Sequence, residues 1–175
     1  TSSAWVVGPW SMSRCRIPMN SVKQYADLLA CESSPMQEHM GVLSAVAHRA
    51  AARKGGAINV VEMGVGDKGY STFAFLAALL DTGGGLTSVD IGPCEDVRAA
   101  VAEYAPGAAH TFVQGDSLAV AEKLPAPIDV LMLDTSHTYS QTVSELETYA
   151  GSVSHAIVLH DIRTRSTVWQ ALYDW

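Results

Sequence analysis

The sequence predicts a doubly wound α/β fold, in which a parallel sheet of at least five strands carries helices on both faces. Two observations support this prediction. From residue 57 onward, short apolar runs of strand length alternate with segments of helical length. The 175 residues are 48% hydrophobic and only 17% charged, which is the composition of a globular chain that can bury a core.

The first 55 residues differ from the rest, and we expect them to form an N-terminal helical cap or lid before a sheet domain over residues 56–175. Helices are predicted over 21–31 and 36–53. In the second, apolar residues recur at three- and four-residue steps, and two glycines follow its end. This segment is expected to cover one face of the domain or to contribute to a substrate pocket.

Five strands and five helices are expected after residue 56, separated by turn residues such as the three glycines at 83–85. The predicted strands are 58–63, 86–91, 110–113, 128–133 and 156–159. The predicted helices are 71–80, 95–104, 117–124, 139–150 and 167–175. In such a sheet, ligands bind beyond the carboxyl ends of the strands.

One carboxylate lies at or just past the end of each predicted strand: Glu62, Asp90, Asp116, Asp134 and Asp161. Scattered surface acids would not follow the strand ends in this way. Aspartate also caps helices, which is a sufficient explanation for Asp116. It is a weaker explanation for Glu62, which lies inside an apolar run. A carboxylate there needs a polar partner, and a ligand ammonium group is one such partner.

Residues 62–69 have the spacing E-x-G-x-G-x-x-G, in which Gly64 and Gly66 let the backbone turn and approach a ligand closely. The glycine spacing also fits a dinucleotide site, with Asp90 about the right distance on to hold a ribose. Glu62 argues against that alternative, because an apolar residue is expected there. Residues 115–117 add a polar corner suited to an adenine edge. A cationic, zwitterionic nucleoside fits this set better than a pyrophosphate does.

Together these motifs make the chain similar to class I S-adenosylmethionine-dependent methyltransferases, whose fold is Rossmann-like. The resemblance covers roughly residues 57–163 and rests on the first motif at 61–72 and on the acids ending the strands. Residues 133–140 and 158–162 resemble a narrower branch. That branch contains small-molecule O-methyltransferases of the macrolide-sugar and rhamnosyl type, and relatives of the cephalosporin hydroxylase proteins.

The resemblance implies roles for individual residues. Asp90 would accept hydrogen bonds from both ribose hydroxyls, and Asp134 would lie beside the sulfonium and the incoming nucleophile. The methionine portion would be held by Glu62 and the glycine backbone, and the adenine by the corner after the third strand. The implied cofactor-binding residues are Glu62, Gly64, Gly66, Asp90, Asp116, Ser117 and Asp134.

Metal-dependent members of the class hold magnesium with carboxylates after the fourth and fifth strands, which here are Asp134 and Asp161. The chain departs from that pattern at Ile162, where many such members carry another oxygen ligand. His137 and His160 lie beside the two acids, so a transition metal is a second possibility. A metal-free site with His137 or His160 as general base is a third, and a structural role for both histidines is a fourth. The sequence assigns no role to the other histidines, including His39.

The remaining features favour a small-molecule acceptor, and the resemblance favours a hydroxyl. A net charge of −7 without an extensive basic patch argues against nucleic acid, and the chain has no apolar run long enough to span a membrane. The three cysteines are odd in number and widely spaced, which predicts a reducing, cytoplasmic location.

The chain ends about one helix after the fifth strand, before the last two strands of the full class. Either further protein follows in the native chain, or a partner subunit in a homodimer or the N-terminal helices are expected to cover the sheet edge. The alternatives to a methyltransferase are a non-catalytic nucleotide-binding module and, with less support, an NAD-dependent oxidoreductase.

Overall fold

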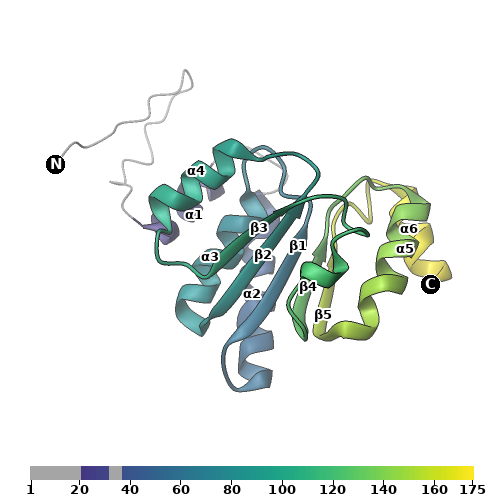
Figure 1. The fold of residues 1–175 in the computed structure, drawn as a ribbon, viewed down its shortest axis with the longest axis horizontal. Helices are drawn as coiled ribbons and strands as arrows, with labels where there is room; N and C mark the ends of the chain where they lie inside the picture. Colours follow the sequence, from purple (N-terminus) through teal and green to yellow (C-terminus); the bar gives the residue numbers. More distant parts are fainter. Residues whose placement is uncertain (1–20, 32–36) are drawn as a thin grey trace.

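A computed structural model describes residues 21–31 and 37–175. Its centre is a five-stranded sheet of order β3-β2-β1-β4-β5, in which every neighbouring pair is parallel (Figure 1). The strands are β1 (Ile58–Met63), β2 (Gly84–Asp90), β3 (His110–Gln114), β4 (Ile128–Leu133) and β5 (Val153–Leu159). This arrangement confirms the predicted doubly wound, Rossmann-like α/β fold.

Helices cover both faces of the sheet because side chains alternate along each strand. The helices are α1 (Val22–Ala30), α2 (Gln37–Lys54), α3 (Tyr70–Thr82), α4 (Glu95–Tyr104), α5 (Tyr139–Tyr149) and α6 (Ser166–Asp174). On β1, Val60 joins the core beneath α1 to α4, whereas Val61 joins a second core that includes Leu146 of α5. Among the described residues, no helix is long and apolar enough to cross a membrane.

The two N-terminal helices pack against the sheet domain. Leu29 of α1 and Leu43 of α2 are buried in the same core as Phe73 of α3. The ring of Tyr25 contacts Phe73 edge-on at 4.4 Å and stacks on Tyr104 at 4.5 Å, measured between ring centroids. These contacts fix α1 and α2 on one face. That residues 1–55 form a separate unit stays a prediction, and residues 1–20 and 32–36 lie outside the described residues.

The predicted helix over 117–124 is only a 3-10 turn, Ala121–Lys123. The residues before it are tied to α5: Ser117 donates its hydroxyl proton to Glu145, and its carbonyl accepts from the Tyr149 hydroxyl. Val120, which is 2% exposed, is buried in the second core. These contacts hold the segment in an irregular path. A prediction from hydrophobic periodicity misses them, because they involve residues distant in the sequence.

Candidate active site

The glycine loop after β1 lies between the ends of β2 and β4. The amide of Gly64 donates to the carbonyl of Val89 at 2.9 Å, and the amide of Asp134 donates to the carbonyl of Met63 at 2.7 Å. Gly64 has a φ of +90°, and a Cβ there would overlap the backbone carbonyl of Asp134. Gly66 also has a positive φ, of +68°, but a Cβ there would meet open space. Gly64 is therefore required by packing, whereas Gly66 faces the region where a ligand would lie.

The carboxylate of Asp90 is bound to the backbone of this loop. Its Oδ2 accepts from the amides of Val65 at 2.8 Å and Gly66 at 3.4 Å, and its Oδ1 accepts from Gly92 at 2.8 Å. Asp90 and Gly66 line a cavity of about 690 Å³, to which Tyr25 of α1 also contributes. Each carboxylate oxygen can accept more than one hydrogen bond, so Asp90 can still accept from a ligand in that cavity.

Glu62 is completely buried under the glycine loop. Its Oε1 accepts hydrogen bonds from Thr72 at 2.6 Å and Ser88 at 2.5 Å, while its Oε2 has no hydrogen-bond partner among the described residues. Burial raises the pKa of this carboxyl above its usual value, although the hydroxyl donors oppose the rise. One buried carboxylate oxygen of Glu62 therefore remains available to a further hydrogen-bond donor.

At the end of β3, the two residues of the predicted adenine corner point in different directions. Asp116 Oδ1 accepts from the amide of Leu118 at 2.8 Å, which forms an Asx turn and caps no helix. The Ser117 side chain is directed inward, where it donates to Glu145 Oε1 at 2.5 Å and accepts from Gln141 at 2.8 Å. Only the backbone of Ser117 is therefore available to a ligand without breaking these bonds.

The sequence analysis missed two features of the residues that follow β2. Ile91, directly after Asp90, is 77% exposed although it is apolar, and such a residue at a strand's carboxyl end is a signal that could have been used. Cys94 lines the cavity described above. Burial, followed by the nearby Asp90 carboxylate, raises the pKa of its thiol to about 11, so the thiol stays protonated and weakly nucleophilic.

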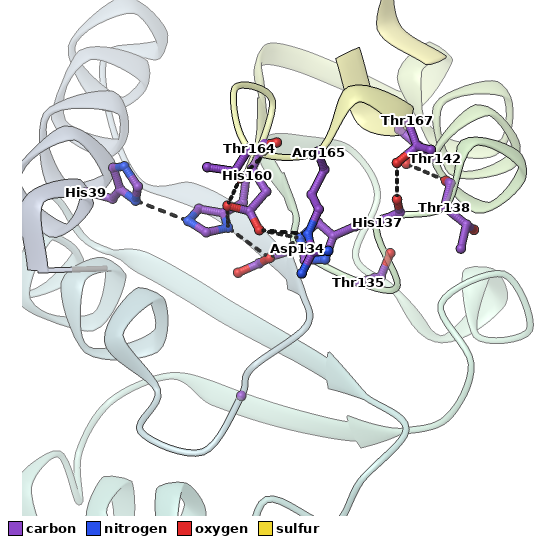
Figure 2. Close-up of polar contacts among 12 residues, drawn as sticks. His39, Asp134, Thr135, His137, Thr138, Thr142, His160, Thr164, Arg165 and Thr167 are labelled. Atoms are coloured by element: carbon purple, nitrogen blue, oxygen red, sulfur yellow. Dashed lines mark hydrogen bonds and ion pairs between the residues drawn. The ribbon is translucent and has the colours of Figure 1, made fainter. Parts of the chain in front are cut away.

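The ends of β4 and β5 bring together Asp134, His137, His160 and Asp161, which we call the carboxylate–imidazole cluster (Figure 2). Asp134 Oδ1 lies 2.8 Å from His137 Nε2 and 3.1 Å from His160 Nδ1. Asp161 is more distant, with oxygens 3.7 Å from His137 Nε2 and 3.5 Å from His160 Nδ1. The four residues that the sequence placed after these two strands therefore do converge.

Neighbouring groups shift the titration of two cluster members. The contact with Asp134 raises the pKa of His160, against the opposing effect of burial. The hydroxyl of Thr164, 2.7 Å from Asp161 Oδ1, lowers the pKa of Asp161, and the two imidazoles and Arg165 add to this effect against burial. These shifts favour an ionised Asp161 carboxylate and make the His160 imidazole a stronger base than an unperturbed one.

His39 of α2 also reaches this site, although the sequence analysis gave it no role. Its Nδ1 lies 3.1 Å from Nε2 of His160, and the two rings meet edge-on with centroids 5.0 Å apart. Figure 2 shows His160 between His39 and Asp134. The two histidines are 121 residues apart in the chain, so only the folded arrangement reveals the contact.

The backbone at the cluster is unusual as well. Among the described residues, three that are not glycine have a left-handed φ: Cys94, His137 at 55° and Asp161 at 56°. Such conformations cost roughly 1–3 kcal/mol each and persist where the surroundings impose them. Thr167 donates to the carbonyl of His137 at 2.6 Å, which helps to hold that residue. Two of the three therefore lie in one cluster, as is common at functional sites.

The fold and the arrangement of these strand ends define a class I S-adenosylmethionine-dependent methyltransferase domain. Residues 61–162 match the family described as a methyltransferase domain, and the chain belongs to that family. This match covers both the glycine loop and the carboxylate–imidazole cluster. It places the chain outside the nicotinamide-dependent oxidoreductases that the glycine spacing alone also fitted. No curated protein matches the chain.

Several solved structures share the fold. The methyltransferase PaMTH1 from Podospora anserina, bound to S-adenosylhomocysteine, is 17% identical; the match covers 93% of this chain and 76% of that one, with a TM-score of 0.61. An O-methyltransferase from Bacillus cereus in complex with the same ligand is 16% identical, with 91% and 78% covered and a TM-score of 0.62. The carbon methyltransferase CurJ is 16% identical, with 90% and 43% covered and a TM-score of 0.60. At these identities the likeness establishes the fold, and the fold accommodates more than one kind of acceptor atom.

Proposed function

We propose that the protein transfers a methyl group from S-adenosylmethionine to a hydroxyl of a small molecule. The observation that carries this proposal is the direct junction between the glycine loop and the carboxylate–imidazole cluster. Gly64 packs on the backbone carbonyl of Asp134. The backbone amide of Asp134 donates a hydrogen bond to the carbonyl of Met63 at the end of β1. A methyl donor seated on the loop would therefore lie beside the groups that can activate an acceptor.

The cofactor site would be the cavity next to β2. Asp90 would bind the ribose hydroxyls. Glu62 and the backbone near Gly64 and Gly66 would hold the methionine portion. Asp116 would contact the adenine, and Ser117 would contribute its backbone. Two of the structural neighbours contain S-adenosylhomocysteine, which supports the choice of cofactor.

In the reaction, the acceptor oxygen would attack the methyl carbon in line with the leaving sulfur. The O–C bond forms as the C–S bond breaks. The electron pair of the C–S bond remains on sulfur, which becomes the neutral thioether of S-adenosylhomocysteine. The hydroxyl proton leaves toward the cluster. His137 or His160 would take this proton directly, or the cluster would hold a divalent ion, which when bound lowers the pKa of a hydroxyl. In both cases the protein's main contribution is orientation of the two reactants.

A methyl-transfer assay tests the proposal. The full chain is incubated with S-adenosylmethionine and a panel of hydroxylated, amino and carbon-acid small molecules, and products are identified by mass spectrometry. The proposal predicts an O-methylated product that disappears in Asp134→Asn. Product found only on nitrogen or carbon would show that the acceptor atom is wrong. Tight binding of S-adenosylhomocysteine without any product would favour the non-catalytic module.

A further inference from the structure

Asp134, His137 and His160 have the arrangement expected of metal ligands. One ligand atom from each of the three lies within 4.8 Å of the others, and among the described residues this is the group that meets that condition. A tetrahedral ion with bonds of about 2.1 Å holds its ligand atoms roughly 3.4 Å apart. The Asp134 Oδ1 contacts at 2.8 and 3.1 Å therefore need to open by roughly 0.6 and 0.3 Å.

The second observation is an orphaned nitrogen. His160 Nδ1 is buried and has no hydrogen-bond partner among the described residues, although Asp134 Oδ1 lies 3.1 Å away. Such a close approach without hydrogen-bond geometry leaves a buried polar atom unsatisfied, which is costly. A metal ion between the two atoms would satisfy both.

The third observation is the support behind His160. Its other nitrogen, Nε2, lies 3.1 Å from Nδ1 of His39. A metal-bound histidine usually donates its remaining N–H to an acceptor, which fixes the tautomer and the ring orientation. His39 is placed to accept that hydrogen bond, so His160 would bind through Nδ1. Asp161, within 3.5–3.7 Å of both imidazoles, would orient the ligands or join them.

We infer that Asp134, His137 and His160 bind a divalent transition-metal ion of the zinc or cobalt type in preference to magnesium. Two imidazoles and one carboxylate suit such ions, whereas magnesium prefers oxygen ligands. Among the alternatives that the sequence leaves open, this inference selects the transition metal, with His137 and His160 as ligands beside Asp134. The use of this ion to activate a hydroxyl rests on the proposed function, but its binding does not.

The test measures binding without substrate. The full chain is stripped with chelator, then titrated with Zn²⁺ and with Mg²⁺ by calorimetry, and with Co²⁺ by visible absorption. We expect one Zn²⁺ per chain, Mg²⁺ binding at least about 100-fold weaker, and Co²⁺ bands without a thiolate charge-transfer band. His160→Gln and His137→Asn should each weaken Zn²⁺ binding at least tenfold, and His39→Gln roughly tenfold, the range for an outer-shell partner. His48→Gln, an exposed histidine elsewhere on α2, is the matched control and should bind like the parent.

Three results would overturn the inference: no Zn²⁺ binding above the buffer background, a thiolate band that assigns the ion to cysteine, or binding unchanged in both ligand variants. Retained S-adenosylhomocysteine binding shows that each variant is folded, and the Co²⁺ spectrum of the unaltered chain decides the ligand type even where a variant fails to fold. Stoichiometric Zn²⁺ binding without O-methylation would sink the proposed function alone. O-methylation by a chain that binds no metal would sink this inference alone.

Discussion

The two halves of the sheet's carboxyl edge are built in different ways. At the ends of β1 and β2, the Asp90 carboxylate accepts hydrogen bonds from three backbone amides. Two belong to the glycine loop and the third to Gly92, two residues after Asp90. At the ends of β4 and β5, side chains contact other side chains, and one of them, His39, comes from a distant helix. Hydrogen bonds from the backbone therefore fix the geometry of the first half, whereas contacts between side chains fix the geometry of the second half.

This difference separates two kinds of sensitivity. The cofactor half should respond most to changes in backbone conformation, because its geometry depends on φ angles and amide positions. The acceptor half should respond most to changes in side-chain chemistry that leave the backbone in place. The predictions below test this division, beginning with the largest expected effect.

Gly64→Ala should be the most damaging single change in the cofactor half. The new Cβ would overlap the Asp134 carbonyl at a φ of +90°, so the loop and β4 would have to separate. We expect a loss of more than roughly 4 kcal/mol in the free energy of unfolding, which is a large part of a typical domain's stability. Chemical denaturation measures this loss.

Gly66→Ala is the matched control, because its Cβ meets open space and only the positive φ is unfavourable. It should cost about 1–2 kcal/mol of stability. The larger Gly66→Val should leave the chain folded while abolishing S-adenosylhomocysteine binding. Equal stability losses in Gly64→Ala and Gly66→Ala would show that the packing of Gly64 on Asp134 is unimportant.

Asp134→Asn should break the acceptor half without disturbing the cofactor half. The amide keeps the shape of the side chain but removes the charge that faces both imidazoles. We expect kcat to fall about 10²–10⁴-fold, which is the range for loss of general acid–base catalysis. The affinity for S-adenosylhomocysteine should stay within about threefold, since the backbone of Asp134 is what contacts the loop. A large loss of affinity would show that the two halves are not separable.

The two halves also differ in how much of them the sequence predicts. Short-range rules are sufficient for the glycine loop and Asp90, because spacing and strand ends place them within one strand–turn–helix unit and its neighbour. The same rules place Asp134 and Asp161 at adjacent strand ends. They do not place His39 against His160, because that contact depends on how α2 crosses the sheet. They also miss the inward turn of Ser117, which is set by Glu145 and Tyr149 of α5.

Asp90→Asn should reduce cofactor affinity by a smaller amount. Loss of the charge weakens the hydrogen bonds expected from the ribose by roughly 1.5–3 kcal/mol, or about 10- to 150-fold in Kd. Asp96→Asn, an acid lining the same cavity, serves as the control and should change Kd little. Titration calorimetry with S-adenosylhomocysteine makes the comparison. An unchanged Kd in Asp90→Asn would mean that the ribose binds elsewhere.

The smallest functional effect is expected at the opposite end of β4, which carries a second buried acid. Asp129 is 1% exposed and accepts from Lys54 Nζ at 2.7 Å, from the Asn59 amide at 2.7 Å and from Ser154 at 2.9 Å. Burial alone would raise the pKa of this carboxyl, but the three donors outweigh it and hold the pKa below its ordinary value of 3.8. His155 Nδ1 also lies 3.5 Å from Asp129 Oδ1, and the site lies at the amino end of the strand, away from the carboxylate–imidazole cluster. Its charge should therefore stabilise the fold and have no part in catalysis.

A carboxyl with a lowered pKa in the folded state stabilises the protein above its ordinary pKa, and that contribution is lost as the pH falls through the folded-state value. Asp129→Asn should therefore lower the free energy of unfolding by roughly 1–3 kcal/mol at neutral pH, and the gap to the unaltered chain should narrow at pH values below 3.8. Denaturation curves at neutral and acidic pH measure both quantities. The kcat and the Kd for S-adenosylhomocysteine should stay within about twofold of the unaltered chain at neutral pH. A loss of kcat comparable to that of Asp134→Asn would mean that the two ends of β4 are coupled through the strand, and that the carboxyl edge cannot be treated as the separate functional region described above.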